Sequence, residues 1–145
     1  MGKKFTQFRV NLEGLETVAR WYTIVTIYNY EQKVAGDINK MILDDALKGV
    51  AEESFCGIKE IKEDYFNKAG EKKTKIRNDK VLANYVFIKT KMNSQVWAIL
   101  TNITGVSAIL CTSGIPIFTP ESKIDHIKEI LAGGDETNAS IWYGE

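Results

Sequence analysis

Residues 82–90, with the sequence LANYVFIKT, constrain the fold more than any other part of this 145-residue chain. The segment is rich in β-branched and aromatic residues, which favours a strand. Side chains alternate between the two faces of a strand, so Tyr85 and Phe87 share one face while Val86 and Ile88 share the other. Both faces are therefore apolar. A chain of ~150 residues buries roughly 68–70% of its unfolded surface, which is enough for one domain with a real core.

Hydrophobic periodicity predicts the elements around this strand. The expected strands cover residues 19–28, 54–65, 74–78, 82–90 and 106–111, with a hairpin turn at 67–73. The first helix is expected to begin at the N-cap Asn29, with Gln32 as its capping-box partner, and to run to about Lys48. A second helix, begun by Asn93 or Ser94, covers residues 93–102. The last is capped by Thr119, has Pro120 in its first position and ends at Gly133.

This order predicts an α+β fold, in which one mainly antiparallel four-stranded sheet has helices packed on one face. It is the sandwich arrangement seen in RRM-like domains. We expect residues 1–18 to form a flexible N-terminal arm, 19–132 the domain and 133–145 a linker-like tail.

Composition excludes several classes of protein. No apolar run reaches the ~18 residues of a membrane span, and residues 1–14 lack the apolar core of a secretory signal. Cys56 and Cys111 stand apart from any metal-type spacing, which excludes a disulfide scaffold or zinc ribbon and is typical of a cytoplasmic protein. We expect no metal, no cofactor and no small-molecule substrate.

Catalytic chemistry finds no support in the sequence. The single histidine, His126, lies off the apolar stripe of the last helix, where a solvated position is the ordinary interpretation. No nucleophile-elbow, phosphate-loop, dinucleotide-binding or HExxH pattern occurs. We therefore predict that the protein is not an enzyme.

Two features point to binding. Helices on one side of the sheet would leave the apolar face on the other side uncovered. That face is either a docking surface or is covered by another layer of the chain itself. Net charge is zero overall, but residues 59–80 carry +3. The basic side chains of this hairpin either bind phosphate groups or only keep the edge of the sheet soluble. They are Lys68, Lys72, Lys73, Lys75 and Arg77.

Four short stretches together resemble the N-terminal (NGN) domain of the NusG family. They are WYTIVTIYNYEQKV at 21–34, NYVFIK at 84–89, NITGV at 102–106 and SGIPIFTPESKI at 113–124. They match, in order, the family's Trp-Tyr strand with its Gly-Tyr-Glu turn, its Phe-Pro-Gly-Tyr-Val strand, its Asn-Thr-Pro-Gly-Val turn and its Gly-x-Pro-x-Pro-x-Ser stretch.

Several family positions differ in this chain. Phe-Pro-Gly is replaced by Leu82-Ala83-Asn84, the Thr of the Asn-Thr-Pro-Gly turn by Ile103, and its Pro by Thr104. The sequence ends within what would be the linker to the family's second domain, a small KOW barrel. We therefore expect no contact with Rho or the ribosome, which the KOW domain makes in the family.

The resemblance implies a bacterial transcription elongation factor that takes part in pausing, termination or antitermination. Such domains bind the clamp helices of the largest RNA polymerase subunit and bridge to the opposite lobe of the cleft, near the upstream fork and non-template DNA. The match puts the clamp-binding aromatic at Tyr85, with Trp21, Leu82 and Phe87 as neighbours. It puts Asn102 near the non-template strand. From their charge alone, we expect the basic hairpin residues to contact upstream nucleic acid or an acidic polymerase surface; they are Lys72, Lys73, Lys75 and Arg77.

Two alternatives remain open. An RRM-type module would stack RNA bases on sheet aromatics, here Tyr85 and Phe87. It would normally carry a Lys/Arg-Gly-Phe/Tyr signature before that strand, which Leu82-Ala83-Asn84 does not supply. A ferredoxin-like regulatory domain that binds a small molecule has no specific feature in its favour. Asn102 has a local interpretation too, as the last residue of a helix before Gly105.

Overall fold

The structure, a computed structural model, describes residues 10–44 and 46–132. Its strands are β1 (Arg20–Thr26), β2 (Ala51–Phe66), β3 (Lys72–Thr90), β4 (Val106–Ile109), β5 (Cys111–Thr112), β6 (Ile115–Pro116) and β7 (Phe118–Thr119). Its helices are α1 (Glu31–Asp44), α2 (Ser94–Thr101) and α3 (Glu121–Leu131). The main sheet has the order β2-β3-β1-β4, with β7 also paired to β1, and its pairs are antiparallel. The predicted α+β fold with a mainly antiparallel sheet is confirmed, and β7 adds a fifth strand to the four that were expected.

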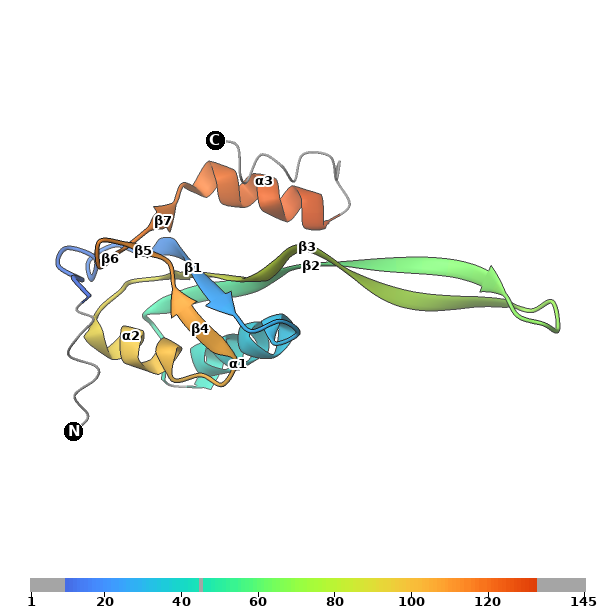
Figure 1. Cartoon of the computed structure of the whole chain (residues 1–145), viewed down its shortest axis with the longest axis horizontal. Coiled ribbons are helices and arrows are strands. Elements are labelled where there is room, and N and C mark those ends of the chain that lie inside the picture. Colours follow the sequence, from blue (N-terminus) through green and yellow to red (C-terminus); the bar gives the residue numbers. More distant parts are fainter. Residues whose placement is uncertain (1–9, 45, 133–145) are drawn as a thin grey trace.

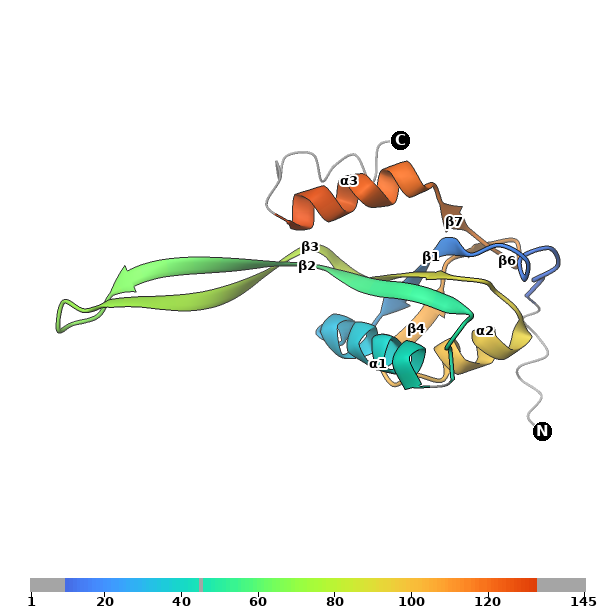
Figure 2. The same ribbon diagram turned by 180° about the vertical axis from the view of Figure 1, so that it is seen from behind.

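Helices cover both faces of the sheet, so the prediction that they pack on one face is wrong. Figures 1 and 2 show α1 and α2 on one side and α3 on the other. Val86 and Ile88 of β3 belong to the core beneath α1 and α2, whereas Phe87 belongs to the core beneath α3. The physical reason is that both faces of β3 are apolar. Exposing either face to water would cost free energy, so helices pack on each of them.

Polar contacts at both ends of α3 fix it to the sheet. Trp21 Nε1 in β1 donates to Glu121 Oε2 over 3.2 Å, at the first residue of the helix. Near its other end, Lys128 Nζ lies 2.6 Å from Glu53 Oε2 in β2. The N-cap of α3 differs from the predicted Thr119. Thr119 belongs to β7 and pairs with Trp21 of β1, so Pro120 takes the N-cap position.

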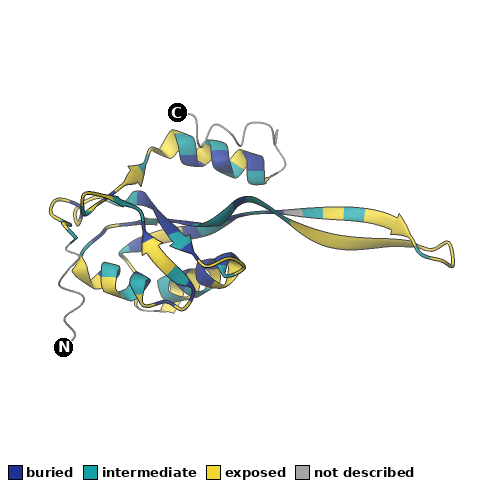
Figure 3. Ribbon diagram, viewed as in Figure 1, coloured by how far each residue is buried: buried dark blue, intermediate teal, exposed yellow. Residues whose placement is uncertain are grey.

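The hairpin of β2 and β3 is longer than predicted. Residues 74–78 and 82–90, expected as separate strands, belong to the single strand β3, and its ladder with β2 continues to the pair Phe66↔Lys72. We call residues 58–80 the arm, because in Figure 3 this part of the hairpin extends beyond the helices with both faces largely exposed. The pairing is irregular at Gly57, where the arm leaves the rest of the domain.

The first helix shows where a local pattern gave the wrong boundary. Asn29 does not cap α1: it has φ +76°, and its side chain accepts a hydrogen bond from Lys80. The helix begins at Glu31 and ends at Asp44, short of the expected Lys48. Of the two residues expected to begin α2, Asn93 is the N-cap, since its Oδ1 accepts a hydrogen bond from Val96 N over 2.8 Å.

The described part of the N-terminal segment packs on the domain, which differs from the flexible arm expected for residues 1–18. Leu15 is only 7% exposed, and its carbonyl accepts a hydrogen bond from Met92 N over 2.9 Å. Asn11 N donates to Gly114 O over 2.7 Å. Residues 1–9 and the expected tail at 133–145 lie outside the described residues.

Two glycines give a matched test of the packing at the root of the arm. A Cβ at Gly57 would lie 2.5 Å from Leu82 Cβ and 2.7 Å from Leu82 O, whereas a Cβ at Gly36 in α1 would meet no atom within 4 Å. We expect Gly57→Ala to lower the free energy of unfolding by about 1–3 kcal/mol through overpacking. Gly36→Ala should raise it by up to about 1 kcal/mol. Urea unfolding measures both, and equal stability of Gly57→Ala and wild type would contradict the close approach.

Candidate interaction surface

A row of side chains on the α3 side of the sheet remains uncovered. Tyr85 in β3 pairs with Val25 in β1, which pairs with Ala108 in β4, so the three share one face. Tyr85 and Val25 are half-buried and Ala108 is exposed. We call these three residues the open row. They form an apolar strip on this face beside the part that α3 covers.

The other predicted polymerase-binding residues lie beneath α3. Trp21 and Leu82 are each 2% exposed and Phe87 is fully buried, in the same cluster as Ile124 and Ile127. The ring centroids of Tyr85 and Phe87 are 6.5 Å apart, within the range of an aromatic contact. The structure therefore brings the four predicted residues together, but leaves only Tyr85 at the surface.

The predicted nucleic-acid residue Asn102 lies in a turn beside the end of β1. Ile27 N donates to Gly105 O over 2.9 Å, and Gly105 lies so close to the Tyr30 ring that a Cβ there would clash with it. Asn102 is exposed, but its Nδ2 donates to Ala98 O over 2.7 Å within α2. Its side chain thus has the local role that the sequence left open, and it also stands at the surface.

The root of the arm contains a buried carboxylate that sequence reasoning missed. Glu31 is fully buried at the start of α1. Its Oε2 accepts a hydrogen bond from Asn84 N over 2.7 Å, and its Oε1 lies 3.2 Å from Lys80 Nζ. Asn84 has φ +71° and donates from Nδ2 to Thr26 O over 3.1 Å. These contacts join α1, β1 and the irregular part of β3.

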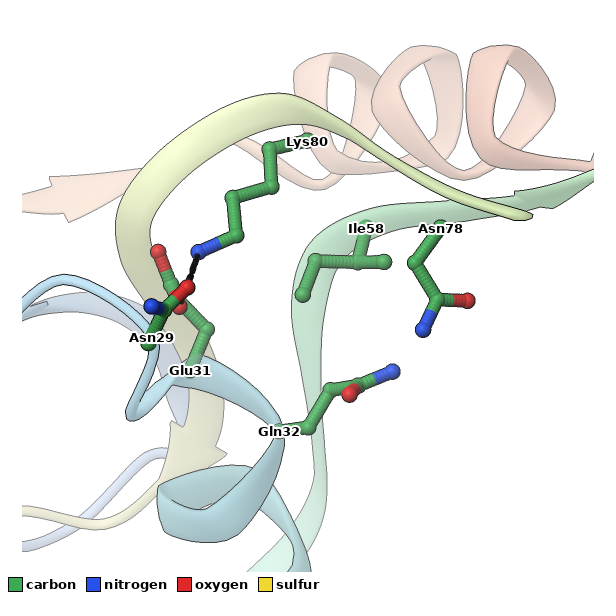
Figure 4. Close-up of a pocket in the computed structure, with 6 residues that line it drawn as sticks. All are labelled: Asn29, Glu31, Gln32, Ile58, Asn78 and Lys80. Carbon is green, nitrogen blue, oxygen red and sulfur yellow. Dashed lines mark hydrogen bonds and ion pairs between the residues drawn. The ribbon is translucent and has the colours of Figure 1, made fainter.

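A polar pocket of about 270 Å³ opens beside this network. Figure 4 shows Asn29 and Glu31 around the ammonium of Lys80, with the amides of Gln32 and Asn78 on the other side of the pocket next to Ile58. The same ammonium lies 3.6 Å from the centroid of the exposed Tyr28 ring, a cation–π contact.

Opposing effects set the pKa of Glu31. Burial raises it, but the hydrogen bond from Asn84 N and the nearby Lys80 ammonium stabilise the charged form, and the net effect lowers the pKa below its usual 4.5. The group is thus an ionised carboxylate held by donors, which suits a structural clamp.

The four basic residues predicted as nucleic-acid contacts are all exposed in β3 along the arm, and each has an acidic neighbour. Lys72 pairs with Asp64 at 3.5 Å, Lys73 with Glu71 at 3.9 Å, and Lys75 with Glu63 at 3.9 Å. Arg77 contacts Glu63 and Asp79. Exposed pairs of this kind contribute little stability, so the lysines are able to exchange these partners for phosphate.

Potential metal ligands and reactive thiols were predicted to be absent, and the described part of the chain bears on both. Among residues 10–44 and 46–132, no group of three or more His, Cys, Asp or Glu side chains is arranged to hold a metal ion. Burial raises the pKa of the Cys56 and Cys111 thiols, which disfavours the reactive thiolate. The helices in these residues are too short or too polar to cross a membrane.

Comparison with known proteins gives a consistent family match. The family model described as "Transcription termination factor nusG" matches residues 19–128. A NusG of Rickettsia typhi, named a transcription termination/antitermination protein, is 26% identical over 113 residues, covering 76% of this chain and 55% of that protein. The Rickettsia felis protein of the same name is 26% identical over 132 residues, covering 88% and 65%. The chain thus spans between half and two thirds of the length of these relatives.

A solved structure shows the same fold. The structure titled "Domain interaction in Thermotoga maritima NusG" superposes with a TM-score of 0.53 at 18% identity, covering 81% of this chain and 60% of that one.

Neutralising Glu31 tests the network of hydrogen bonds and ion pairs that Glu31 makes at the root of the arm. The folded pKa lies below the unfolded value, so the stabilisation by Glu31 is present above the unfolded pKa and is lost as the pH falls through the folded one. We expect Glu31→Gln to lower the free energy of unfolding at pH 7 by about 1–3 kcal/mol. The difference from wild type should shrink well below pH 4.5, the usual value.

Urea unfolding across this pH range measures the effect. Glu52→Gln, which removes an exposed partner of Lys89, is the matched control and should change stability by less than about 0.5 kcal/mol. A gap between Glu31→Gln and wild type that does not depend on pH would contradict the role of the carboxylate charge.

Proposed function

The chain belongs to the NusG family, and from this premise we propose that it modulates transcription elongation, pausing and termination by binding RNA polymerase. The proposed contact is with the clamp helices of the largest subunit, from which the domain bridges the cleft to the opposite lobe. The role is one of binding, without catalysis. The described residues offer an apolar docking surface and a separate charged arm, which are the parts that such a bridge needs.

The open row is the observation that carries this proposal. Tyr85, Val25 and Ala108 leave an apolar strip accessible beside the part of the sheet that α3 covers. Exposed apolar surface on a small domain is typical of an interaction site, and aromatic anchors dominate the energetics of such sites. A pair of clamp helices offers apolar ridges that an open sheet face can receive.

Trp21, Leu82 and Phe87 take a supporting part in this proposal. They lie beneath α3 and hold the ring of Tyr85 from the side, as its contact with Phe87 shows. Burial prevents them from contacting a partner while α3 stays in place. The alternative RRM-type function loses support for the same reason, because a fully buried Phe87 cannot stack on a base.

The Tyr85→Ala variant tests the docking surface. Truncating a central anchor typically costs ~2 kcal/mol or more, so we expect roughly thirtyfold weaker binding to core RNA polymerase. Circular dichroism checks that the variant is folded. Tyr65→Ala, which removes a partly exposed tyrosine from the arm, is the matched control and should bind core polymerase like wild type. Full affinity of folded Tyr85→Ala would rule out this interface.

We further propose that the surface around Asn102 and the basic residues of the arm lie beside nucleic acid in the elongation complex. The Asn102 turn adjoins the end of β1, and an amide side chain donates to phosphates and both donates to and accepts from bases. Lys72, Lys73, Lys75 and Arg77 supply the positive charge that phosphate attracts.

Site-specific crosslinking tests both placements. A photoreactive group at position 102 should crosslink to the non-template strand, and one at position 73 to upstream DNA or emerging RNA. A group on α3 at the exposed position 125 is the control, and should crosslink to neither strand. Crosslinks from 102 and 73 to protein alone would contradict the placements while leaving the polymerase interface intact.

A further inference from the structure

The tip of the arm lies far from the rest of the domain. The ladder runs from the pair Ile58↔Lys80 to the pair Phe66↔Lys72, a length of about 27 Å at ~3.4 Å per residue. Among the residues that the structure describes, Figures 1 and 2 show no helix or strand against either face of this ribbon. Side chains at the tip are therefore available to a partner from both sides.

Each face of the tip carries an aromatic ring beside a lysine. Tyr65 pairs with Lys73 and Phe66 with Lys72, and because directly paired residues share a face, the two pairs lie on opposite faces. Phe66 is 72% exposed and Tyr65 43%. A solvent-exposed strand needs neither ring for solubility, so their position calls for a partner.

The contacts that these rings make inside the chain are weak. Lys75 Nζ lies 5.7 Å from the centroid of the Tyr65 ring, near the ~6 Å limit of a cation–π contact. Lys72 lies 3.5 Å from Asp64 across an exposed surface. A partner that offers a flat ring and a negative charge can replace both contacts at little cost.

Charge favours a polyanion over a protein surface as that partner. The arm, residues 58–80, holds eight Lys or Arg and five Asp or Glu, a net charge of +3, so the rest of this neutral chain carries −3. Aromatic rings that alternate with basic side chains are the usual means of binding single-stranded nucleic acid, in which bases stack on rings and phosphates meet cations.

We propose that the arm tip binds single-stranded nucleic acid, with one base stacked on Phe66, another on Tyr65, and Lys72 and Lys73 at the adjoining phosphates. This rests on the proposed function only in that a transcription complex supplies such a strand beside the arm. The binding itself belongs to this chain alone, so it is measurable without polymerase.

Fluorescence anisotropy of the full chain with labelled oligonucleotides of about a dozen nucleotides tests the proposal. Single-stranded DNA, single-stranded RNA of the same sequence, and duplex DNA are the three probes. We expect both single strands to bind more tightly than the duplex, with affinity that falls as salt is added. The ratio of DNA to RNA affinity identifies which strand the tip prefers.

Phe66→Leu separates stacking from simple hydrophobic contact, because leucine keeps apolar bulk but has no aromatic face. We expect about tenfold weaker binding of single strands for Phe66→Leu and for Tyr65→Leu, and wild-type affinity for Phe66→Trp. Ile76→Ala is the matched control: Ile76 is 59% exposed on the face of Phe66, nearer the domain, and its loss should change affinity less than twofold.

Charge reversal at Lys72 and Lys73 should weaken binding further and flatten its salt dependence. The proposal is overturned if wild type binds no single strand, if duplex binds as tightly, if Phe66→Leu keeps full affinity, or if Ile76→Ala is as weak as Phe66→Leu. Binding of Phe66→Leu to core polymerase without nucleic acid should equal that of wild type. Failure at Tyr85 and failure at Phe66 are thus separate results.

Discussion

The carboxylate of Glu31 is the interaction on which the relation between the domain and its arm depends. It is fully buried, and it receives Asn84 N and Lys80 Nζ, both from β3, where the strand passes from the sheet into the arm. A buried charge without such partners is costly, so α1 and this part of β3 must stay together. The close approach of Gly57 to Leu82 completes the same junction from β2. The arm therefore leaves the domain in a fixed direction.

Two asparagines illustrate how much of this junction the sequence could predict. Asn29 and Asn84 have positive φ, +76° and +71°, a conformation that asparagine tolerates better than most residues. The family motifs to which these segments are similar carry glycine at both positions, which was the available signal. Local capping rules instead favoured Asn29 as an N-cap. They failed because its side chain binds Lys80, 51 residues away, and no local pattern contains that contact.

Local patterns succeeded where the deciding contacts are local. The cap of α2 by Asn93 involves residues three apart, and the alternation of Val86, Phe87 and Ile88 follows from strand geometry alone. The position of α3 could not be predicted in this way. It depends on Trp21 and Glu121, which are 100 residues apart, and it turns most of the predicted docking face into core. Sequence thus predicted which residues gather on that face, but not which of them a partner can contact.

The fixed arm gives this neutral chain a strong separation of charge. A net +3 lies on residues 58–80 and a net −3 on the remainder, while the tip stands about 27 Å away along the ribbon. That distance is roughly three Debye lengths at physiological ionic strength, so the tip's charge is little affected by that of the domain. The electric field of a polyanion orients such a molecule with its positively charged arm toward the polyanion, before any specific contact forms. Because Glu31 fixes the direction of the arm relative to the domain, orienting the arm also orients the face that carries Tyr85 and the open row.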